Sequence, residues 1–186
     1  MEPTPASLLD RIRYREDVTA WSRFVDLYTP VLYRWARRIG LQESDACDLV
    51  QDVLAILLQK IGEFRYDPNR SFRAWLKTVA LNLVRERQRR GIERQLPDGD
   101  GRSLADSAES QAFWDDDYRR HLLQRAIGIM QGDFNPTTWK ACWEVVVQGR
   151  PAAQVAAQFG MSVGAVYAAR CRILTRLRKE LAGMFE

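Results

Sequence analysis

The chain has 186 residues, of which 46% are hydrophobic, and a formal net charge of +4. This length and composition suffice for one large domain or two small ones with apolar cores. No apolar run approaches the roughly 18 residues of a membrane span, and the first residues, MEPTPASLLDRIR, contain acids and arginines where a signal peptide needs an apolar core. We therefore expect a cytoplasmic protein without a membrane segment.

Helical periodicity recurs along the chain and strand signals are nearly absent, so we predict an all-α fold. The expected helices span about 7–15, 18–28, 30–39, 44–62, 71–92, 113–130, 136–147, 152–159 and 163–182. Thr29 with Pro30, and Asn135 with Pro136, each predict a cap followed by a proline in the first helical turn.

Residues 93–112 lack periodicity and are rich in Gly, Asp and Ser. They predict a flexible acidic linker between two small helical domains, residues 1–92 and residues 113–186. The charges agree with this division: residues 60–95 carry 10 basic and 4 acidic groups, residues 96–120 carry 3 and 7, and residues 164–186 carry 5 and 2. Two basic segments separated by an acidic one indicate two contacts with nucleic acid.

The expected helix over residues 45–60 presents Asp48, Gln51 and Asp52 on the side opposite its apolar stripe. An acidic patch does not bind DNA. These residues are either solvated, with the acids stabilising the helix N-terminus, or they dock onto a basic protein partner.

The expected helix over residues 71–91 has a core stripe of Phe72, Leu76, Val79 and Leu83. A neighbouring face holds an aromatic ring, polar groups and two arginines: Trp75, Thr78, Asn82, Arg85 and Arg89. Such a face can stack on a base, bond to its edge and neutralise phosphates, and the preceding loop from Arg65 to Arg70 could hold an unstacked base. The alternative is that Trp75 closes the core and the arginines are solvated.

Residues 151–179, PAAQVAAQFGMSVGAVYAARCRILTRLRK, have the spacing of a helix-turn-helix that reads duplex DNA. Ala156 is small where two helices touch, Gly160 can take a positive φ in the turn, and Val166 faces the core. Pro151 suits the first turn of the leading helix, and Ser162 can cap the second helix.

The second helix of this motif divides into two faces. The inward stripe is expected to contain Val166, Ile173, Leu174, Leu177 and Leu181. The face expected to enter the major groove, after the cap at Ser162, contains Ala165, Ala168, Arg172, Arg176 and Lys179. Arg170 falls within the inward stripe, so it must pair with an acid such as Glu144 or extend outward. A solvated basic face is the alternative to DNA binding.

Catalytic and metal-binding chemistry has little support in this sequence. Cys47, Cys142 and Cys171 are odd in number and far apart, and His121 is the only histidine. We expect buried reduced thiols, no metal, no cofactor and no enzymatic activity.

The order of these features resembles the extracytoplasmic-function (ECF) group of bacterial RNA polymerase sigma factors, in the sigma-70 family. The resemblance rests on DLVQDVL, on YDPNRSFRAWLKTVALNLVRERQRR, on a variable linker, and on a helix-turn-helix ending in VGAVYAARCRILTRLRK. It covers nearly the whole chain, and it implies two helical domains, called region 2 and region 4.

The resemblance implies a role for each region 2 surface. Asp48, Gln51 and Asp52 match the helix that docks on the clamp helices of the polymerase β′ subunit. The loop and helix from Arg65 to Arg89 match the segment that opens and reads the minus-ten promoter element. Within it, Phe72 and Trp75 match aromatic positions of the melting segment, and Asn82 matches an asparagine that contacts a flipped-out base.

By the same resemblance, the C-terminal domain would bind the minus-thirty-five element as duplex and contact the β flap. Here the chain departs from the family, since Tyr167, Ala168 and Ala169 replace a common Lys-Ser-Arg run, and the sequence that is read does not follow from the match. Many family members are held inactive by an anti-sigma factor, which adds a possible partner.

Two other classes of protein remain as alternatives. A stand-alone helix-turn-helix regulator would be a dimer that binds a palindromic duplex without polymerase. A purely structural helical module would not explain two basic faces. A sigma factor would be a monomer when free, and would bind promoter DNA well only with core polymerase.

Overall fold

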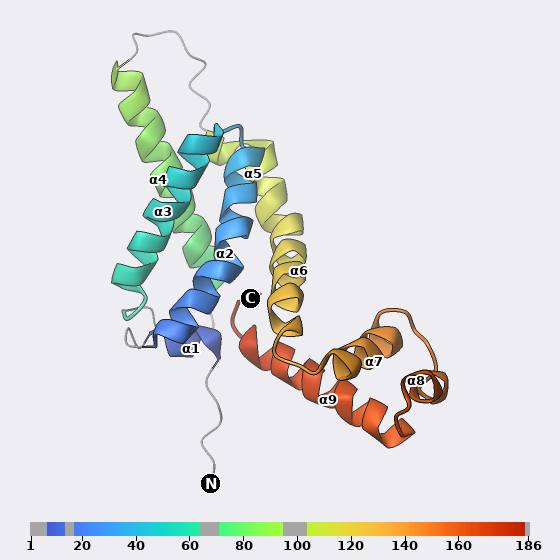
Figure 1. Cartoon of the computed structure of the whole chain (residues 1–186). Helices are drawn as coiled ribbons and strands as arrows, with labels where there is room; N and C mark the ends of the chain where they lie inside the picture. The colour runs from blue at the N-terminus through green and yellow to red at the C-terminus, as the bar shows by residue number, and fades with distance from the viewer. Residues whose placement is uncertain (1–6, 14–16, 64–70, 95–103, 185–186) are drawn as a thin grey trace. The chain divides into compact units, whose positions relative to one another are not determined.

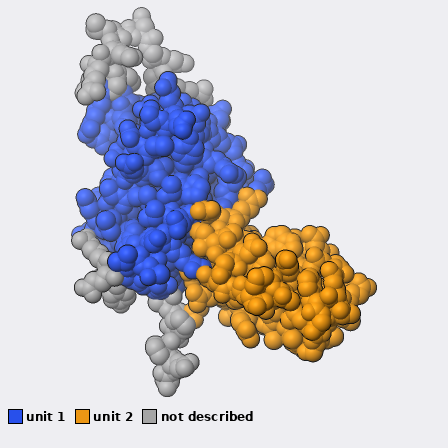
Figure 2. All heavy atoms as spheres, in the orientation of Figure 1, with its two compact units in different colours: residues 1–122, 183–186 blue, residues 123–182 orange. Residues whose placement is uncertain are grey.

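The computed structural model describes residues 7–13, 17–63, 71–94 and 104–184, and every regular element within these ranges is a helix (Figure 1). The all-α expectation is therefore confirmed. The chain forms two compact units, residues 1–122 with 183–186 (unit 1) and residues 123–182 (unit 2), which Figure 2 distinguishes by colour. None of the described helices is both long and apolar enough to cross a membrane.

In the described part of unit 1, four helices precede residue 95. They are α1 (Leu8–Ile12), α2 (Val18–Arg38), α3 (Glu43–Lys60) and α4 (Phe72–Arg94). α2 packs against both α1 and α3, and α3 also packs against α4 (Figure 1). The shared core is aromatic: the rings of Phe24 and Tyr28 stack with centroids 4.4 Å apart, and Phe72 of α4 meets both edge to face.

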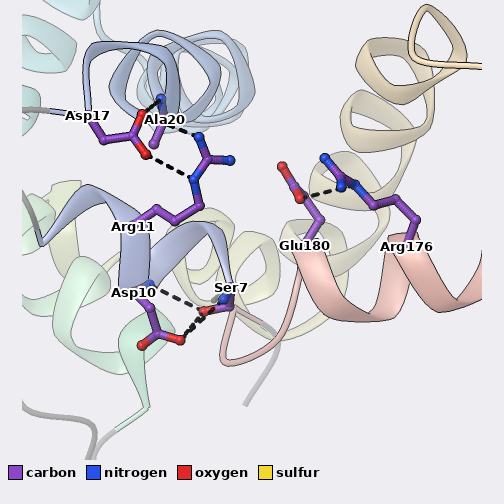
Figure 3. A network of polar contacts seen from close by, with 7 residues as sticks. All are labelled: Ser7, Asp10, Arg11, Asp17, Ala20, Arg176 and Glu180. Carbon is purple, nitrogen blue, oxygen red and sulfur yellow. Dashed lines mark hydrogen bonds and ion pairs between the residues drawn. The ribbon is translucent and has the colours of Figure 1, made fainter. Parts of the chain in front are cut away.

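The start of α2 is stabilised by a carboxylate with two partners. Asp17 accepts a hydrogen bond from the backbone amide of Ala20, so it caps the helix, and it also accepts from Arg11 Nε at 2.9 Å (Figure 3). These two hydrogen bonds, that from Arg11 first, lower the pKa of Asp17. Ser7 and Asp10 form a reciprocal capping box that begins α1.

The predicted break at Thr29 and Pro30 is wrong, because α2 continues through Pro30 to Arg38. An interior proline removes one backbone hydrogen bond and costs roughly 3 kcal/mol. Buried residues lie on both sides of it, among them Leu27, Val31 and Leu32, and each fully buried side chain of this size contributes about 1.5–3 kcal/mol. Continuous burial therefore outweighs the proline.

Residues 104–117 form short helical elements within unit 1, although residues 93–112 were predicted to be a flexible linker. They form a 3-10 turn, η1 (Leu104–Asp106), then α5 (Ala108–Ala112) and a π-helical turn, η2 (Phe113–Asp117). η1 packs on α4 and α5 packs on α2. Ala105, in the predicted linker, and Trp114, just after it, are both fully buried, so apolar anchors hold this stretch, and the compact unit extends to Leu122.

Unit 2 consists of the end of one helix and three further helices. The helices are α6 (Tyr118–Gln131), which begins in unit 1, α7 (Pro136–Val146), α8 (Ala152–Phe159) and α9 (Val163–Glu180). The predicted cap at Asn135 is confirmed, since its side chain accepts from the amides of Thr137 and Thr138. α9 packs against both α7 and α8, and two buried clusters lie between these helices, one around Trp139 and Ile173 and one around Val155 and Val166.

Candidate nucleic-acid interface

The predicted polar face of α4 lies on one exposed side of the helix. Thr78, Asn82, Arg85 and Arg89 are exposed, while Trp75 is half-buried beside them. The opposite side is buried and differs slightly from the prediction. It contains Phe72, Leu76, Ala80, Leu81 and Val84, whereas Val79 and Leu83 are half-buried. The exposed set has the spacing of three and four residues that places side chains along a single helical face.

Phe72 does not lie on this face, which corrects its assignment as a DNA contact. Its ring is fully buried and meets the rings of Phe24 and Tyr28 at centroid distances of 5.9 and 5.7 Å. The ring of Trp75 packs on Phe72 with centroids 5.7 Å apart. Phe72 therefore supports Trp75 from within the core. Arg65 and Arg70, which were predicted to flank an unstacked base, lie outside the described residues.

Arg85 is held by an acid that the sequence analysis assigned to the linker. Its Nη2 lies 2.6 Å from Asp106 Oδ1 and its Nε lies 3.4 Å from Oδ2, while Nη1 donates to Asn82 Oδ1 at 3.3 Å. The hydrogen bond that the Arg85 guanidinium donates to Asp106 raises the pKa of that guanidinium. Sequence reasoning missed Asp106 because the residue lies in a stretch without periodicity.

The helix-turn-helix has the predicted turn and the predicted cap at Ser162, whereas Pro151 lies at the N-cap of α8, just before its first turn. α8 ends at Gly160, which takes φ +63° and ψ +33°, a left-handed conformation that favours glycine. Ser162 caps α9 by accepting a hydrogen bond from the amide of Ala165 at 3.1 Å. Ala156 and Val166 are buried together where α8 and α9 meet. The three constrained positions therefore have the predicted environments.

The outer face of α9 differs in part from the predicted groove face. Ser162, Ala168, Arg172 and Arg176 are exposed, but Ala165 and Lys179 are half-buried. Arg176 lies 3.6 Å from the carboxylate of Glu180 on the same helix (Figure 3). Tyr167, Cys171 and Thr175 are exposed at positions that adjoin Ala168 and Arg172 on the helical wheel. The side chain of Tyr167 is half exposed. Its ring is the largest side chain on this face, and it was not among the residues predicted to contact DNA.

Arg170 is exposed, which decides between its two predicted environments. Glu144 accepts a hydrogen bond from Arg150 at 2.9 Å and makes no ion pair with Arg170 among the described residues. Ala169, one residue earlier, takes the buried position in the inward stripe, and Leu174 is only half-buried. The stripe is thus displaced toward Ala169, so Arg170 extends into solvent.

The acidic face of α3 is exposed as predicted, with Asp48, Gln51 and Asp52 all accessible. Asp52 is not independent of the rest of unit 1. Its carboxylate forms an ion pair with Arg87 of α4, and Arg87 also donates to the backbone carbonyl of Asp45 at 3.2 Å. Asp48 and Asp52 therefore differ in their contacts, because of the two only Asp52 forms an ion pair with α4 among the described contacts.

The described residues contain no group of three or more His, Cys, Asp or Glu side chains that could hold a metal ion. Cys142 is buried, as expected for a structural thiol, and burial raises its pKa. Cys47 and Cys171 are exposed, so the expectation of buried thiols is wrong for these two. The ring of His121 stacks on Phe113 with centroids 5.9 Å apart.

Residues 24–92 match the family described as Sigma-70 region 2. Over 167 residues the chain is 27% identical to the ECF RNA polymerase sigma factor BldN of Streptomyces coelicolor, a match that covers 89% of this chain and 61% of that protein. Over 185 residues it is 25% identical to the ECF RNA polymerase sigma factor SigE of Mycolicibacterium smegmatis, covering 97% of this chain and 69% of that one.

A shorter match, 36% identical over 67 residues, is to the RNA polymerase sigma factor CnrH of Cupriavidus metallidurans, and covers 36% of this chain and 34% of that protein. The chain thus spans less than two thirds of the length of BldN and of CnrH. Among solved structures, the RsbN-BldN complex matches with a TM-score of 0.39 at 22% identity, covering 91% of this chain and 96% of that chain. CnrH with the cytosolic domain of CnrY matches with a TM-score of 0.37 at 22% identity, covering 91% and 92%. At these scores neither structure positions a residue of this chain.

Proposed function

Since the chain belongs to the extracytoplasmic-function group of the sigma-70 family, we propose that it is a transcription initiation factor that directs core RNA polymerase to a subset of promoters. The observation that carries this proposal is an exposed basic helix in each compact unit, α4 in unit 1 and α9 in unit 2. Two such helices suit a protein that holds a promoter at two places.

In this proposal α4 reads and opens the minus-ten element. Trp75 stacks on an unpaired base, Asn82 bonds to a base edge, and Arg85 and Arg89 meet the phosphates. Taking a base out of the stack costs a few kcal/mol, and stacking on an aromatic side chain returns roughly 1–3 kcal/mol per base. The half-buried position of Trp75, supported by Phe72, favours this role because the ring is held in place before DNA arrives.

The helix-turn-helix holds the minus-thirty-five element as duplex. The exposed face of α9 enters the major groove, where Arg172 can bond to a guanine edge and Ala168 can contact a thymine methyl group. The turn at Gly160 and the cap at Ser162 support this role because they set the angle at which α9 leaves α8.

The remaining surfaces are proposed to bind polymerase. Asp48, Gln51 and Asp52 dock on the β′ clamp helices, and unit 2 contacts the β flap. The free protein is a monomer located in the cytoplasm, and an anti-sigma factor is a further candidate partner, because many members of the resembled family are held inactive by one.

The test is transcription in vitro with purified core polymerase and fragmented genomic DNA, followed by permanganate footprinting of unpaired thymines at the promoters found. Asn82→Ala is expected to reduce opening while it leaves binding to core polymerase unchanged. Gln124→Ala, which removes an exposed amide from α6, is the matched control. The proposal would be contradicted if none of the templates gave a promoter-specific product. Tight binding of a dimer to a palindromic duplex without polymerase would instead indicate a stand-alone regulator.

A further inference from the structure

The segment Leu104–Asp117, here called the acidic segment, contains five carboxylates and no basic residue. The carboxylates belong to Asp106, Glu109, Asp115, Asp116 and Asp117. The segment belongs to unit 1, and η1 packs directly on α4. A negatively charged part of the chain therefore lies against the helix that carries the basic face.

Apolar burial holds the acidic segment in place. Ala105, Phe113 and Trp114 are fully buried, and Trp114 packs on Trp35 of α2 with centroids 5.6 Å apart. The buried hydroxyl of Ser110 accepts a hydrogen bond from Trp35 Nε1 at 3.2 Å. Because these contacts do not involve the carboxylates, a change at an exposed carboxylate should leave the segment folded.

Three side chains of α4 contact the acidic segment. Arg85 binds Asp106, Gln88 Oε1 accepts from the amide of Leu104 at 3.0 Å, and Lys77 Nζ lies 3.3 Å from Gln111 Oε1. Lys77 also lies 4.0 Å from a carboxylate oxygen of Asp115. These contacts extend along α4 over three helical turns, and Arg85 is the one of the three side chains that belongs to the predicted DNA-binding face.

Asp106 occupies one of the guanidinium edges of Arg85 that can bind a phosphate. The Nε and Nη2 atoms of a guanidinium form a fork that fits two oxygens of either a carboxylate or a phosphate. Both atoms of Arg85 are directed at Asp106, at 3.4 and 2.6 Å, and Nη1 is directed at Asn82. A phosphate can take this fork only if Asp106 leaves it.

We propose that the acidic segment competes with single-stranded DNA for the basic face of α4, with Asp106 in the place of a backbone phosphate. This inference rests on the proposed function of α4. The side chains of Arg85 and Asp106 are 46% and 52% exposed, so water screens their ion pair. An exposed ion pair of this kind is weak enough for DNA to displace Asp106 from Arg85. Removing the Asp106 carboxylate should therefore strengthen DNA binding about two- to fivefold.

The test is the affinity of the full chain for a labelled single-stranded oligonucleotide, measured by fluorescence anisotropy over a range of salt concentrations. Asp106→Asn is expected to bind two- to fivefold more tightly at low salt, and its log K against log salt should steepen by about 0.7, the value for one additional phosphate contact on a single strand. Asp116→Asn is the matched control, because it removes the same charge from an exposed residue that makes no ion pair with α4 among the described contacts.

Further variants separate failure of this inference from failure of the proposed function. When Arg85 is already replaced by Gln, Asp106→Asn should change the affinity for the oligonucleotide no more than Asp116→Asn does. If Arg85→Gln weakens binding but Asp106→Asn equals Asp116→Asn, the competition is overturned and α4 remains the DNA surface. If Arg85→Gln and Asn82→Ala both bind DNA as the unchanged protein does, α4 is not that surface and both proposals are overturned. Tryptophan fluorescence and thermal unfolding of each variant check that the fold is retained.

Discussion

The phenolic oxygens of Tyr28 and Tyr118 lie 3.0 Å apart in the core of unit 1, where α2 meets the start of α6. Tyr118 also donates a hydrogen bond to the backbone carbonyl of Met184 at 3.1 Å. A phenolic hydroxyl has one hydrogen, and that of Tyr118 is donated to Met184. Tyr28 must therefore be the donor in the hydrogen bond between the two hydroxyls. This chain of hydrogen bonds joins three segments that are distant in the sequence.

We expect Tyr118→Phe to destabilise the protein more than Tyr28→Phe. Removing the Tyr118 hydroxyl leaves both the Tyr28 donor and the Met184 carbonyl without their partner, at about 1–3 kcal/mol for each buried group. Removing the Tyr28 hydroxyl leaves the bond to Met184 intact and should cost about 1 kcal/mol. Denaturant unfolding measures both, and equal losses would contradict the assigned direction of donation.

Stability should fall at alkaline pH. Burial raises the pKa of both Tyr28 and Tyr118, so their hydroxyls stay neutral in the folded chain when they ionise near pH 10 in the unfolded chain. Above that pH the unfolded chain holds fewer protons, so the free energy of unfolding decreases as pH rises. In the double variant Tyr28→Phe/Tyr118→Phe this decrease should be smaller, as measured by denaturant midpoints between pH 8 and pH 11. If the free energy of unfolding of the double variant decreases as steeply as that of the unchanged protein, ionisable groups other than these two tyrosines cause the decrease.

Gly160→Ala should destabilise unit 2 by about 1–2 kcal/mol, since an L side chain strains a left-handed conformation. Added at this position, a Cβ would meet nothing within 4 Å, so the effect would come from the backbone alone. Gly128→Ala is the control, because Gly128 lies in α6, also with open space around it, and alanine should stabilise that helix by up to about 1 kcal/mol. Thermal unfolding of the two variants should therefore shift in opposite directions.

Asp48→Lys and Asp52→Asn should have different effects on unit 1. Asp52→Asn removes the ion pair with Arg87 and should cost about 0.2–1 kcal/mol, the range for an exposed pair. Asp48→Lys reverses an exposed charge, so it should leave the unfolding midpoint nearly unchanged but abolish co-purification with a fragment carrying the β′ clamp helices. Retention of that complex would remove the acidic face of α3 from the proposed docking surface.

Arg172→Ala should weaken binding to a minus-thirty-five duplex by about 1–3 kcal/mol if its guanidinium bonds to a guanine edge. Arg178→Ala removes the same charge from the exposed surface of α9, away from the face of Arg172, and serves as the control. Competition assays at fixed salt concentration, with duplexes that carry single base changes, compare the two. An equal loss for both variants would indicate that Arg172 contributes only general electrostatic attraction.

The local features of this protein could be predicted from its sequence. The helices follow from apolar spacing, the caps at Asn135 and Ser162 follow from side chains that accept backbone hydrogen bonds, and the left-handed turn follows from Gly160. The exposed face from Thr78 to Arg89 follows from helical spacing as well. Each of these depends on residues within a few positions of one another, so a short stretch of sequence contains the whole cause.

The tertiary structure decided the features that depend on distant partners. Pro30 lies inside a helix because burial along α2 outweighs the lost hydrogen bond, and Phe72 is withdrawn from the α4 face because the rings of α2 enclose it. Asp106 meets Arg85 because Ala105 and Trp114 anchor a stretch that has no periodicity of its own. The sequence by itself therefore determined the helices and their capped ends, whereas packing determined which charged groups remain exposed for another molecule, since that depends on contacts between residues far apart in the chain.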